Sequence, residues 1–177
     1  MAAANAILVP LQCEFFALEG LSQLMKTVES VRTTLNPQLT IHGIVLTMFD
    51  SRNNLSNQVV ADVRQFMGSK VYNTMIPRNV RISEAPSYGK PVLVYDLKCV
   101  GSEAYLRLAT EIIQRERVNS TGGVPTIAWQ MIEHPDRHKY DLSSLEAIAY
   151  GGAPSAPELV RKIKSEFGAL PGNGWGM

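Results

Sequence analysis

Two glutamates and two arginines are the side chains of this sequence best suited to chemistry. Glu14, Arg52, Arg81 and Glu84 each lie in a short polar segment that directly follows an apolar run. A pair of carboxylates can act as general acid and general base, and a guanidinium can bind phosphate. Glu84 has a simpler interpretation as the ion-pair partner of a neighbouring arginine. The three polar segments are 12–16, 50–54 and 77–84.

Apolar runs with strand or helix periodicity position these segments. A continuous run such as 6–11 is typical of a strand buried in a parallel sheet, whereas apolar residues at three- and four-residue steps indicate a helix. The predicted strands are 6–11, 41–49, 71–76 and 92–95, and the predicted helices are 17–35, 55–67 and 102–113, the last capped by Ser102. This alternation predicts an α/β fold in which a parallel sheet has flanking helices. The polar segments then lie at the carboxyl ends of the strands, where such sheets bind ligands.

The composition predicts a soluble globular protein. The formal net charge of +1 creates no overall field that would attract nucleic acid, so any DNA binding must be local. Cys13 and Cys99 lie far apart, without metal-ligand spacing or a secretory leader, which predicts reduced thiols and a cytoplasmic location. The apolar runs are far shorter than the roughly 20 residues of a membrane helix, so we expect no membrane span.

The character of the sequence changes near residue 118. Both tryptophans and eight of the 13 glycines follow this position. The polar, glycine-containing segment after a charged helix end is typical of a linker. We therefore expect a first domain at 1–117, a junction at 118–123 and a smaller α/β fragment at 124–177.

Three strings in the first domain carry a resemblance to a known family. They are VPLQCEFFALEG at 9–20, LTMFDSRNNL at 46–55 and IPRNVRISEAPSYGKP at 76–91. In order and spacing they resemble the C-terminal half of ParA/Soj-type partitioning ATPases. The resemblance implies a partial P-loop-NTPase-like sheet and a role in chromosome or plasmid segregation. In that family, ATP-dependent dimers bind DNA without sequence preference and work with a ParB-like partner protein.

The resemblance also implies a nucleotide site. Met48, Pro77, Arg78 and Asn79 match positions against the adenine of ATP, although Pro77 and Asn79 can equally be read as shaping a turn. ATP and Mg²⁺ are the family's cofactors. The 177 residues contain neither a G-x-x-x-x-G-K-[ST] loop nor the family's metal-binding aspartates. The sequence therefore does not decide whether the chain is an enzyme, and we expect it to be inactive alone.

DNA binding is implied at two arginines. Arg52 and Arg81 match family positions on the DNA-binding surface, and Arg78 and Lys90 would extend the basic patch. The alternative is that these side chains are ordinary solvated surface. A third interpretation is a non-catalytic interaction module that self-associates by adding a strand to an open sheet edge.

The last residues resemble part of a second family. A predicted strand at 145–150, a glycine turn and a predicted helix at 156–167 are followed by the string NGWGM, and Ser155 and Glu158 form a capping-box pair. This pattern resembles the AMP-binding domain of acyl-CoA synthetases, with Gly151, Gly152 and Ala153 approaching the acyl-adenylate. The alternative functions are thus an adenylate-forming ligase fragment or a simple tight turn.

The histidines do not predict a metal site. His134 and His138 have the spacing of helical metal ligands, but Pro135 interrupts the helix between them and no third ligand is near. We therefore predict no bound metal from these residues.

Overall fold

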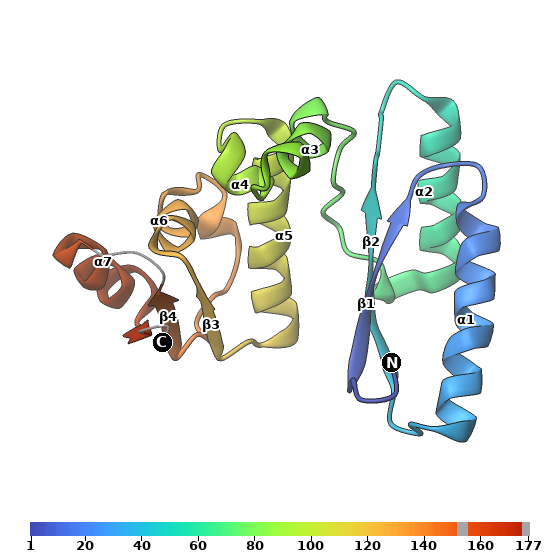
Figure 1. Cartoon of the computed structure of the whole chain (residues 1–177), viewed down its shortest axis with the longest axis horizontal. Helices are drawn as coiled ribbons and strands as arrows, with labels where there is room; N and C mark the ends of the chain where they lie inside the picture. Colours follow the sequence, from blue (N-terminus) through green and yellow to red (C-terminus); the bar gives the residue numbers. More distant parts are fainter. Residues whose placement is uncertain (152–155, 175–177) are drawn as a thin grey trace. The chain divides into compact units, whose positions relative to one another are not determined.

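The computed structural model describes residues 1–151 and 156–174, which fall into two compact units, Met1–Ala104 and Tyr105–Met177 (Figure 1). The α/β prediction of parallel strands with flanking helices is confirmed. None of the helices in the described part of the chain combines the length and apolarity that a membrane crossing needs.

The first unit is built on two parallel strands and two long helices. They are β1 (Ala6–Gln12), α1 (Ala17–Thr34), β2 (Thr40–Thr47) and α2 (Asn54–Met67). Each helix buries one apolar stripe against the sheet, and Leu21, Val28 and Val63 are at most 2% exposed. This packing makes one hydrophobic core that holds the strand ends in place.

The predicted strand at 71–76 is present only as an extended segment beside β2. Two isolated parallel bridges join Ile44 to Val71 and Phe49 to Pro77. The amide of Ile76 donates to the carbonyl of Leu46 at 2.8 Å, so the segment follows β2 to its carboxyl end. This is enough to bring residue 77 and the residues after it to the edge where β1 and β2 end.

The predicted strand at 92–95 is wrong, because this segment is the short helix α4 (Val92–Tyr95). Pro91 precedes its first turn and its carbonyl accepts from the amide of Tyr95 at 3.0 Å. Four apolar residues do not distinguish a strand from a helical turn, and here the proline starts the turn. The other short elements are η1 (Gly68–Lys70), α3 (Val80–Glu84) and η2 (Ala85–Tyr88).

The predicted cap at Ser102 is also wrong. Helix α5 (Val100–Glu116) begins two residues earlier, and its residues belong to both units. Ser102 is fully buried, and its hydroxyl donates to the carbonyl of Asp96 at 2.7 Å. The serine therefore anchors the helix from inside its first turn.

The second unit contains a three-stranded parallel sheet in the order β3-β4-β5. Its strands are glycine-rich: the Cβ of an alanine at Gly122 would lie 3.1 Å from the carbonyl oxygen of Ala149. The predicted strand at 145–150 and helix at 156–167 are present as β4 and α7, while Ser155 lies outside the described residues. The elements are β3 (Ser120–Gly123), α6 (Pro125–Glu133), η3 (Arg137–Lys139), β4 (Ala147–Gly151), α7 (Pro157–Phe167) and β5 (Leu170–Gly174).

Candidate functional site

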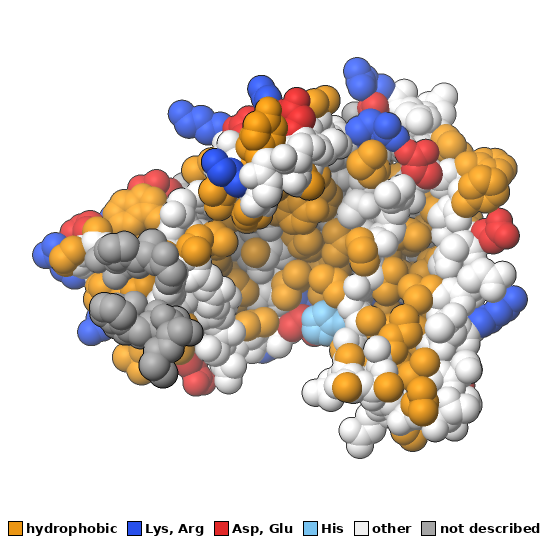
Figure 2. Space-filling view, viewed as in Figure 1, with side chains coloured by type: hydrophobic (Ala, Val, Ile, Leu, Met, Phe, Trp, Pro, Cys, Tyr) orange, Lys and Arg blue, Asp and Glu red, His pale blue; other side chains and the backbone are white. Residues whose placement is uncertain are grey.

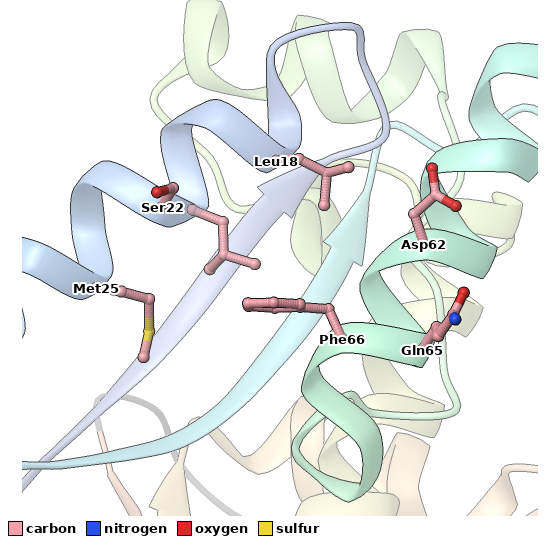
Figure 3. A pocket seen from close by; sticks show the side chains of 7 residues that line it. Leu18, Ser22, Met25, Asp62, Gln65 and Phe66 are labelled. Carbon is pink, nitrogen blue, oxygen red and sulfur yellow. The ribbon is translucent and has the colours of Figure 1, made fainter.

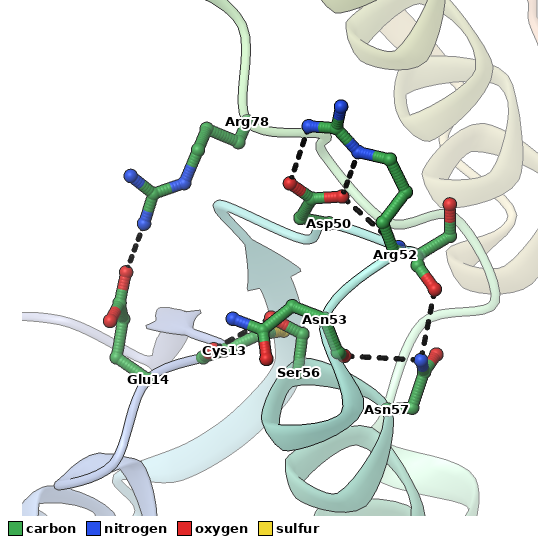
Figure 4. A network of polar contacts seen from close by, with 9 residues as sticks. Cys13, Glu14, Asp50, Arg52, Asn53, Ser56, Asn57 and Arg78 are labelled. Carbon is green, nitrogen blue, oxygen red and sulfur yellow. Dashed lines mark hydrogen bonds and ion pairs between the residues drawn. The ribbon is translucent and has the colours of Figure 1, made fainter.

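The carboxyl end of β1 is fixed by buried backbone contacts. The amide of Cys13 donates to the carbonyl of Thr47 at 2.9 Å, and the hydroxyl of Ser56 in α2 donates to the carbonyl of Cys13 at 3.1 Å (Figure 4). Burial, and then the charge of Glu14, raise the pKa of the Cys13 thiol to about 11. Cys13 is therefore an inert anchor, and Glu14 is the first side chain after it that can act on a ligand.

Just after the end of β2, Asp50 and Arg52 form an ion pair with two side-chain hydrogen bonds. One carboxylate oxygen of Asp50 accepts from the backbone amide of Arg52 at 3.1 Å and from Nε at 2.9 Å, and the other accepts from Nη2 at 2.8 Å (Figure 4). These hydrogen bonds lower the pKa of Asp50 to about 2 and raise the pKa of Arg52. The Arg52 side chain is nevertheless 88% exposed, so its remaining nitrogen faces solvent.

A second ion pair joins the first and third polar segments. The backbone amide of Arg78 donates to the carbonyl of Phe49 at 2.9 Å, and its guanidinium pairs with the carboxylate of Glu14 (Figure 4). The positive charge of Arg78 also contributes to the lowered pKa of Asp50. The structure therefore brings together the ends of β1, β2 and the extended segment, as the sequence predicts.

Residues predicted to face adenine flank this network. Met48 has a φ of 54°, a left-handed conformation unusual for a residue with a side chain, and the bridge from Phe49 to Pro77 brings it beside the third segment. Asn79 caps α3, because its side-chain oxygen accepts from the amide of Arg81 at 2.9 Å. The capping role agrees with the turn-shaping interpretation and leaves the side-chain NH₂ of Asn79 outside the cap.

Arg81 is bound by two carboxylates. Its guanidinium contacts Glu84 at 2.9 Å and Asp96 at 3.3 Å, and hydrogen bonding with Glu84 raises its pKa. Tyr95 donates to the same Glu84 carboxylate at 3.3 Å and stacks on Tyr88 with ring centroids 5.0 Å apart. Glu84 is thus an arginine partner, and it is engaged separately from Glu14 rather than paired with it.

In the second unit the structure describes only part of the predicted adenylate turn. Gly151 ends β4 and pairs with Gly174 of β5, while Gly152 and Ala153 lie outside the described residues. His134 is buried, and its Nδ1 accepts from the amide of Asp136 at 3.2 Å. Within 1–151 and 156–174, no group of three or more His, Cys, Asp or Glu side chains is arranged to hold a metal ion.

Comparison with known families matches the first unit and its strand-end network. Residues 4–92 match the CobQ/CobB/MinD/ParA nucleotide binding domain family. The chain belongs to this family. Within it, the chromosome partitioning protein ParA of Caulobacter vibrioides is 69% identical over 117 residues, which are 66% of this chain and 44% of that protein. The sporulation initiation inhibitor protein Soj of Bacillus subtilis is 52% identical over 112 residues, 63% of this chain and 44% of that protein.

The chain spans less than half the length of these ParA and Soj relatives. Separately, residues 97–177 are similar to the AMP-binding enzyme family, so both resemblances found in the sequence are confirmed. Among solved structures, a cobyrinic acid a,c-diamide synthase from Mycobacterium smegmatis has a TM-score of 0.48 at 29% identity. That alignment covers 65% of this chain and 40% of the synthase.

Two side chains that contact the predicted site residues were missed by sequence reasoning. Asp96 binds Arg81, and Tyr95 binds Glu84. Tyr95 is the last residue of the segment 92–95 and Asp96 follows it, so the strand prediction for this segment did not assign their side chains to the strand-end edge. A signal was present, because Asp96 also accepts from the amide of Lys98 at 3.2 Å, a local turn that aspartate favours before a helix.

Proposed function

We propose that the first unit is the DNA-facing and adenine-facing part of a ParA-type partitioning ATPase. The observation that carries the proposal is the convergence of three strand-end segments, with the exposed guanidinium of Arg52 at their edge. The relatives named chromosome partitioning proteins share this part of the chain at up to 69% identity. On this proposal the chain acts in the cytoplasm, on non-specific DNA and with a ParB-like partner, during chromosome or plasmid segregation.

DNA contact is proposed to be electrostatic and weak. Arg52 and Arg81 each keep a guanidinium nitrogen beyond their carboxylate contacts, and such a nitrogen can donate to a backbone phosphate. The same carboxylates cancel most of the local positive charge, and basic and acidic side chains lie next to one another on the face in view (Figure 2). A phosphate must therefore compete with Asp50, Glu84 and Asp96 for these arginines.

The proposed nucleotide contact is limited to the base. Met48, Pro77, Arg78 and Asn79 form an edge that carries the side-chain NH₂ of Asn79 and the guanidinium of Arg78, and these donors suit a heterocycle with hydrogen-bonding nitrogens. The residues do not fit Mg²⁺, because Glu14 and Asp50 are each occupied by an arginine. We therefore propose that these 177 residues alone bind ATP weakly and do not hydrolyse it.

The direct test is salt-dependent retention on non-specific duplex DNA. Arg52→Ala combined with Arg81→Ala removes two phosphate contacts, so the slope of log affinity against log salt should fall in magnitude by about 2. The matched control is Arg161→Ala combined with Lys164→Ala, which removes the same charge from exposed positions of α7 in the second unit. Equal loss of retention in both double variants would mean that the arginines of the first unit have no special role.

A gain-of-binding variant sharpens the same test. Asp50→Asn keeps an oxygen that can accept from the amide of Arg52 but removes the charge that competes with phosphate. We expect the variant to be retained at higher salt than the wild type. If Asp50→Asn does not change retention, Arg52 does not contact DNA.

A second candidate function rests on the match of residues 97–177 to AMP-binding enzymes. We propose it as a fragment of an adenylate-binding turn, because β4 ends at Gly151 with glycine-rich strands on both sides. A non-hydrolysable acyl-adenylate analogue should then slow hydrogen exchange of the Gly151 amide. If the analogue does not change the exchange rate, Gly151 only helps to shape a tight turn.

A further inference from the structure

Two stacked tyrosines lie beside one of the arginines proposed for DNA binding. The rings of Tyr88 in η2 and Tyr95 in α4 have centroids 5.0 Å apart at an interplanar angle of 28°. Tyr95 donates at 3.3 Å to the same carboxylate oxygen of Glu84 that accepts from Arg81 at 2.9 Å. A continuous series of contacts therefore joins the aromatic pair to the guanidinium.

The outer tyrosine presents a free aromatic face. One face of the Tyr88 ring lies against Tyr95, yet Tyr88 is 65% exposed, so solvent reaches the other face. The turn that carries the ring is anchored in the unit, because the amide of Lys90 donates at 3.1 Å to the carbonyl of Ala85, which is 1% exposed. Gly89 has a φ of 62°, which allows the chain to turn back at this point. Tyr88 is thus a supported aromatic side chain that faces solvent.

The charges around the tyrosine pair largely cancel. Segment 78–98 contains four basic and two acidic side chains, which are Arg78, Arg81, Lys90, Lys98, Glu84 and Asp96. Both acidic side chains bind Arg81, and Arg78 is paired with Glu14. Lys90 is exposed two residues after Tyr88, and in the part of the chain that the structure describes it forms no ion pair. Phosphates can therefore bind beside the ring, but charge alone would hold DNA only weakly.

Another exposed aromatic side chain of the unit lacks these basic neighbours. Phe66 is 76% exposed and lies at a groove of about 710 Å³ between α1 and α2 (Figure 3). The described residues that line this groove include Asp62 but no lysine or arginine. An aromatic contact at Phe66 would have no cation in the groove to bind a phosphate, so Phe66 is a suitable control position.

We propose that the Tyr88–Tyr95 pair is a stacking platform for an unpaired base, so that this surface binds single-stranded DNA more tightly than duplex DNA. The base would lie on Tyr88, and Arg81 and Lys90 would bind the neighbouring phosphates. In a duplex each base is stacked between its neighbours, whereas an unpaired base can offer its face to an aromatic side chain. Because carboxylates cancel much of the positive charge here, stacking should supply the larger share of the affinity. This inference rests on the proposed DNA-binding function and specifies the form of the DNA.

The test is fluorescence anisotropy of the full chain with a labelled single strand of mixed sequence and with the duplex of the same sequence. The wild type should bind the single strand more tightly. Tyr88→Ala should weaken single-strand binding by about tenfold, as expected for the loss of one stacked base, and should leave duplex binding unchanged. Tyr88→Leu keeps an apolar side chain but lacks a ring, so it should weaken binding similarly. Phe66→Ala is the matched control, and equal effects of Phe66→Ala and Tyr88→Ala would overturn the proposal.

The salt dependence of single-strand binding separates the ring from the guanidinium. Arg81→Ala removes a phosphate contact, so the slope of log affinity against log salt should fall in magnitude by about 0.7. Tyr88→Ala should lower the affinity at every salt concentration without changing this slope. If Tyr88→Ala reduces the slope as much as Arg81→Ala does, the tyrosine acts only by positioning Arg81 and the stacking proposal is wrong.

Two further results would contradict the stacking platform. The first is displacement of the strand by free thymidine 5′-monophosphate at an equal concentration of nucleotide, which would mean that the ring binds single nucleotides. The second is a larger loss of single-strand binding for Phe15→Ala than for Tyr88→Ala, because Phe15 is 74% exposed after β1 and could stack on a base instead. The proposed function is tested separately, by the response of duplex retention to the combined substitution of Arg52 and Arg81.

Discussion

The two units carry different chemical groups at the ends of their strands. In the first unit, strand ends carry charged side chains that neutralise one another, as in the pairs of Arg52 with Asp50 and Arg78 with Glu14. In the second unit, β4 ends at Gly151, and glycines such as Gly122 let neighbouring backbones approach. The first unit can thus recognise a ligand through side-chain charge, whereas the second can offer mainly backbone groups. Each nucleotide-related family match therefore requires its own experimental test.

The largest effects on stability are expected from truncating a buried side chain in the core of each unit. Leu21→Ala in the first unit and Ile163→Ala in the second remove side chains that are 2% and 0% exposed. Each should cost about 2–5 kcal/mol of unfolding free energy. Hydrogen exchange should accelerate at Ile44 and Leu46 for Leu21→Ala, and at Ile148 for Ile163→Ala. If either substitution accelerates exchange equally in β2 and β4, the units are not independently stabilised.

The next largest effects are expected from glycine substitutions, which test the strand packing of each unit. An added Cβ at Gly43 would lie 2.3 Å from the ring of Tyr72, which is 0% exposed, so Gly43→Ala should cost roughly 1–3 kcal/mol in the first unit. Gly122→Ala should strain the second unit through the backbone of Ala149.

Gly20→Ala is the control for both glycine substitutions, and chemical denaturation is the measurement. An added Cβ at Gly20 meets nothing within 4 Å, and Gly20 lies inside α1. This substitution should therefore stabilise the first unit by about 0.5–1 kcal/mol. Destabilisation by Gly20→Ala would show that the helix cannot accept the methyl group.

A smaller effect should appear at acidic pH. The pKa of Asp50 in the folded chain is about 2, below its ordinary value of 3.8, so the ionised carboxylate stabilises the fold above about pH 4. That stabilisation should be lost as the pH falls from about 4 toward 2. Thermal unfolding of Asp50→Asn should be less sensitive to pH in this window than that of the wild type. Parallel pH profiles would mean that the ion pair does not contribute.

The smallest change expected is in thiol reactivity. Cys13 is buried and its pKa is raised to about 11, whereas Cys99 is partly exposed. Iodoacetamide at neutral pH should therefore modify Cys99 first, and peptide mass mapping gives the order. Earlier modification of Cys13 would show that the end of β1 opens readily.

Sequence reasoning succeeded where the pattern was long and local. The periodicity over 17–35 and the buried runs beside it predicted α1, β1 and β2 with small errors at their ends. It failed at 92–95, where the proline before a short apolar run decided the conformation. The pair of Arg78 with Glu14 joins positions 64 residues apart. The order of strands predicted that their two segments converge, but not which side chains of those segments would pair.

Thermal unfolding of the full chain with and without Mg-ATP tests the central claim most directly. We propose that the strand-end edge offers ATP only contacts to its base, because Glu14 and Asp50 are each paired with an arginine and the sequence contains no phosphate-binding loop. Because such a contact binds weakly, we expect no clear upward shift of the melting transition at Mg-ATP concentrations below its Kd. A ligand at 100 times its Kd adds about 2.7 kcal/mol of stability, so a clear upward shift with Mg-ATP would contradict the account.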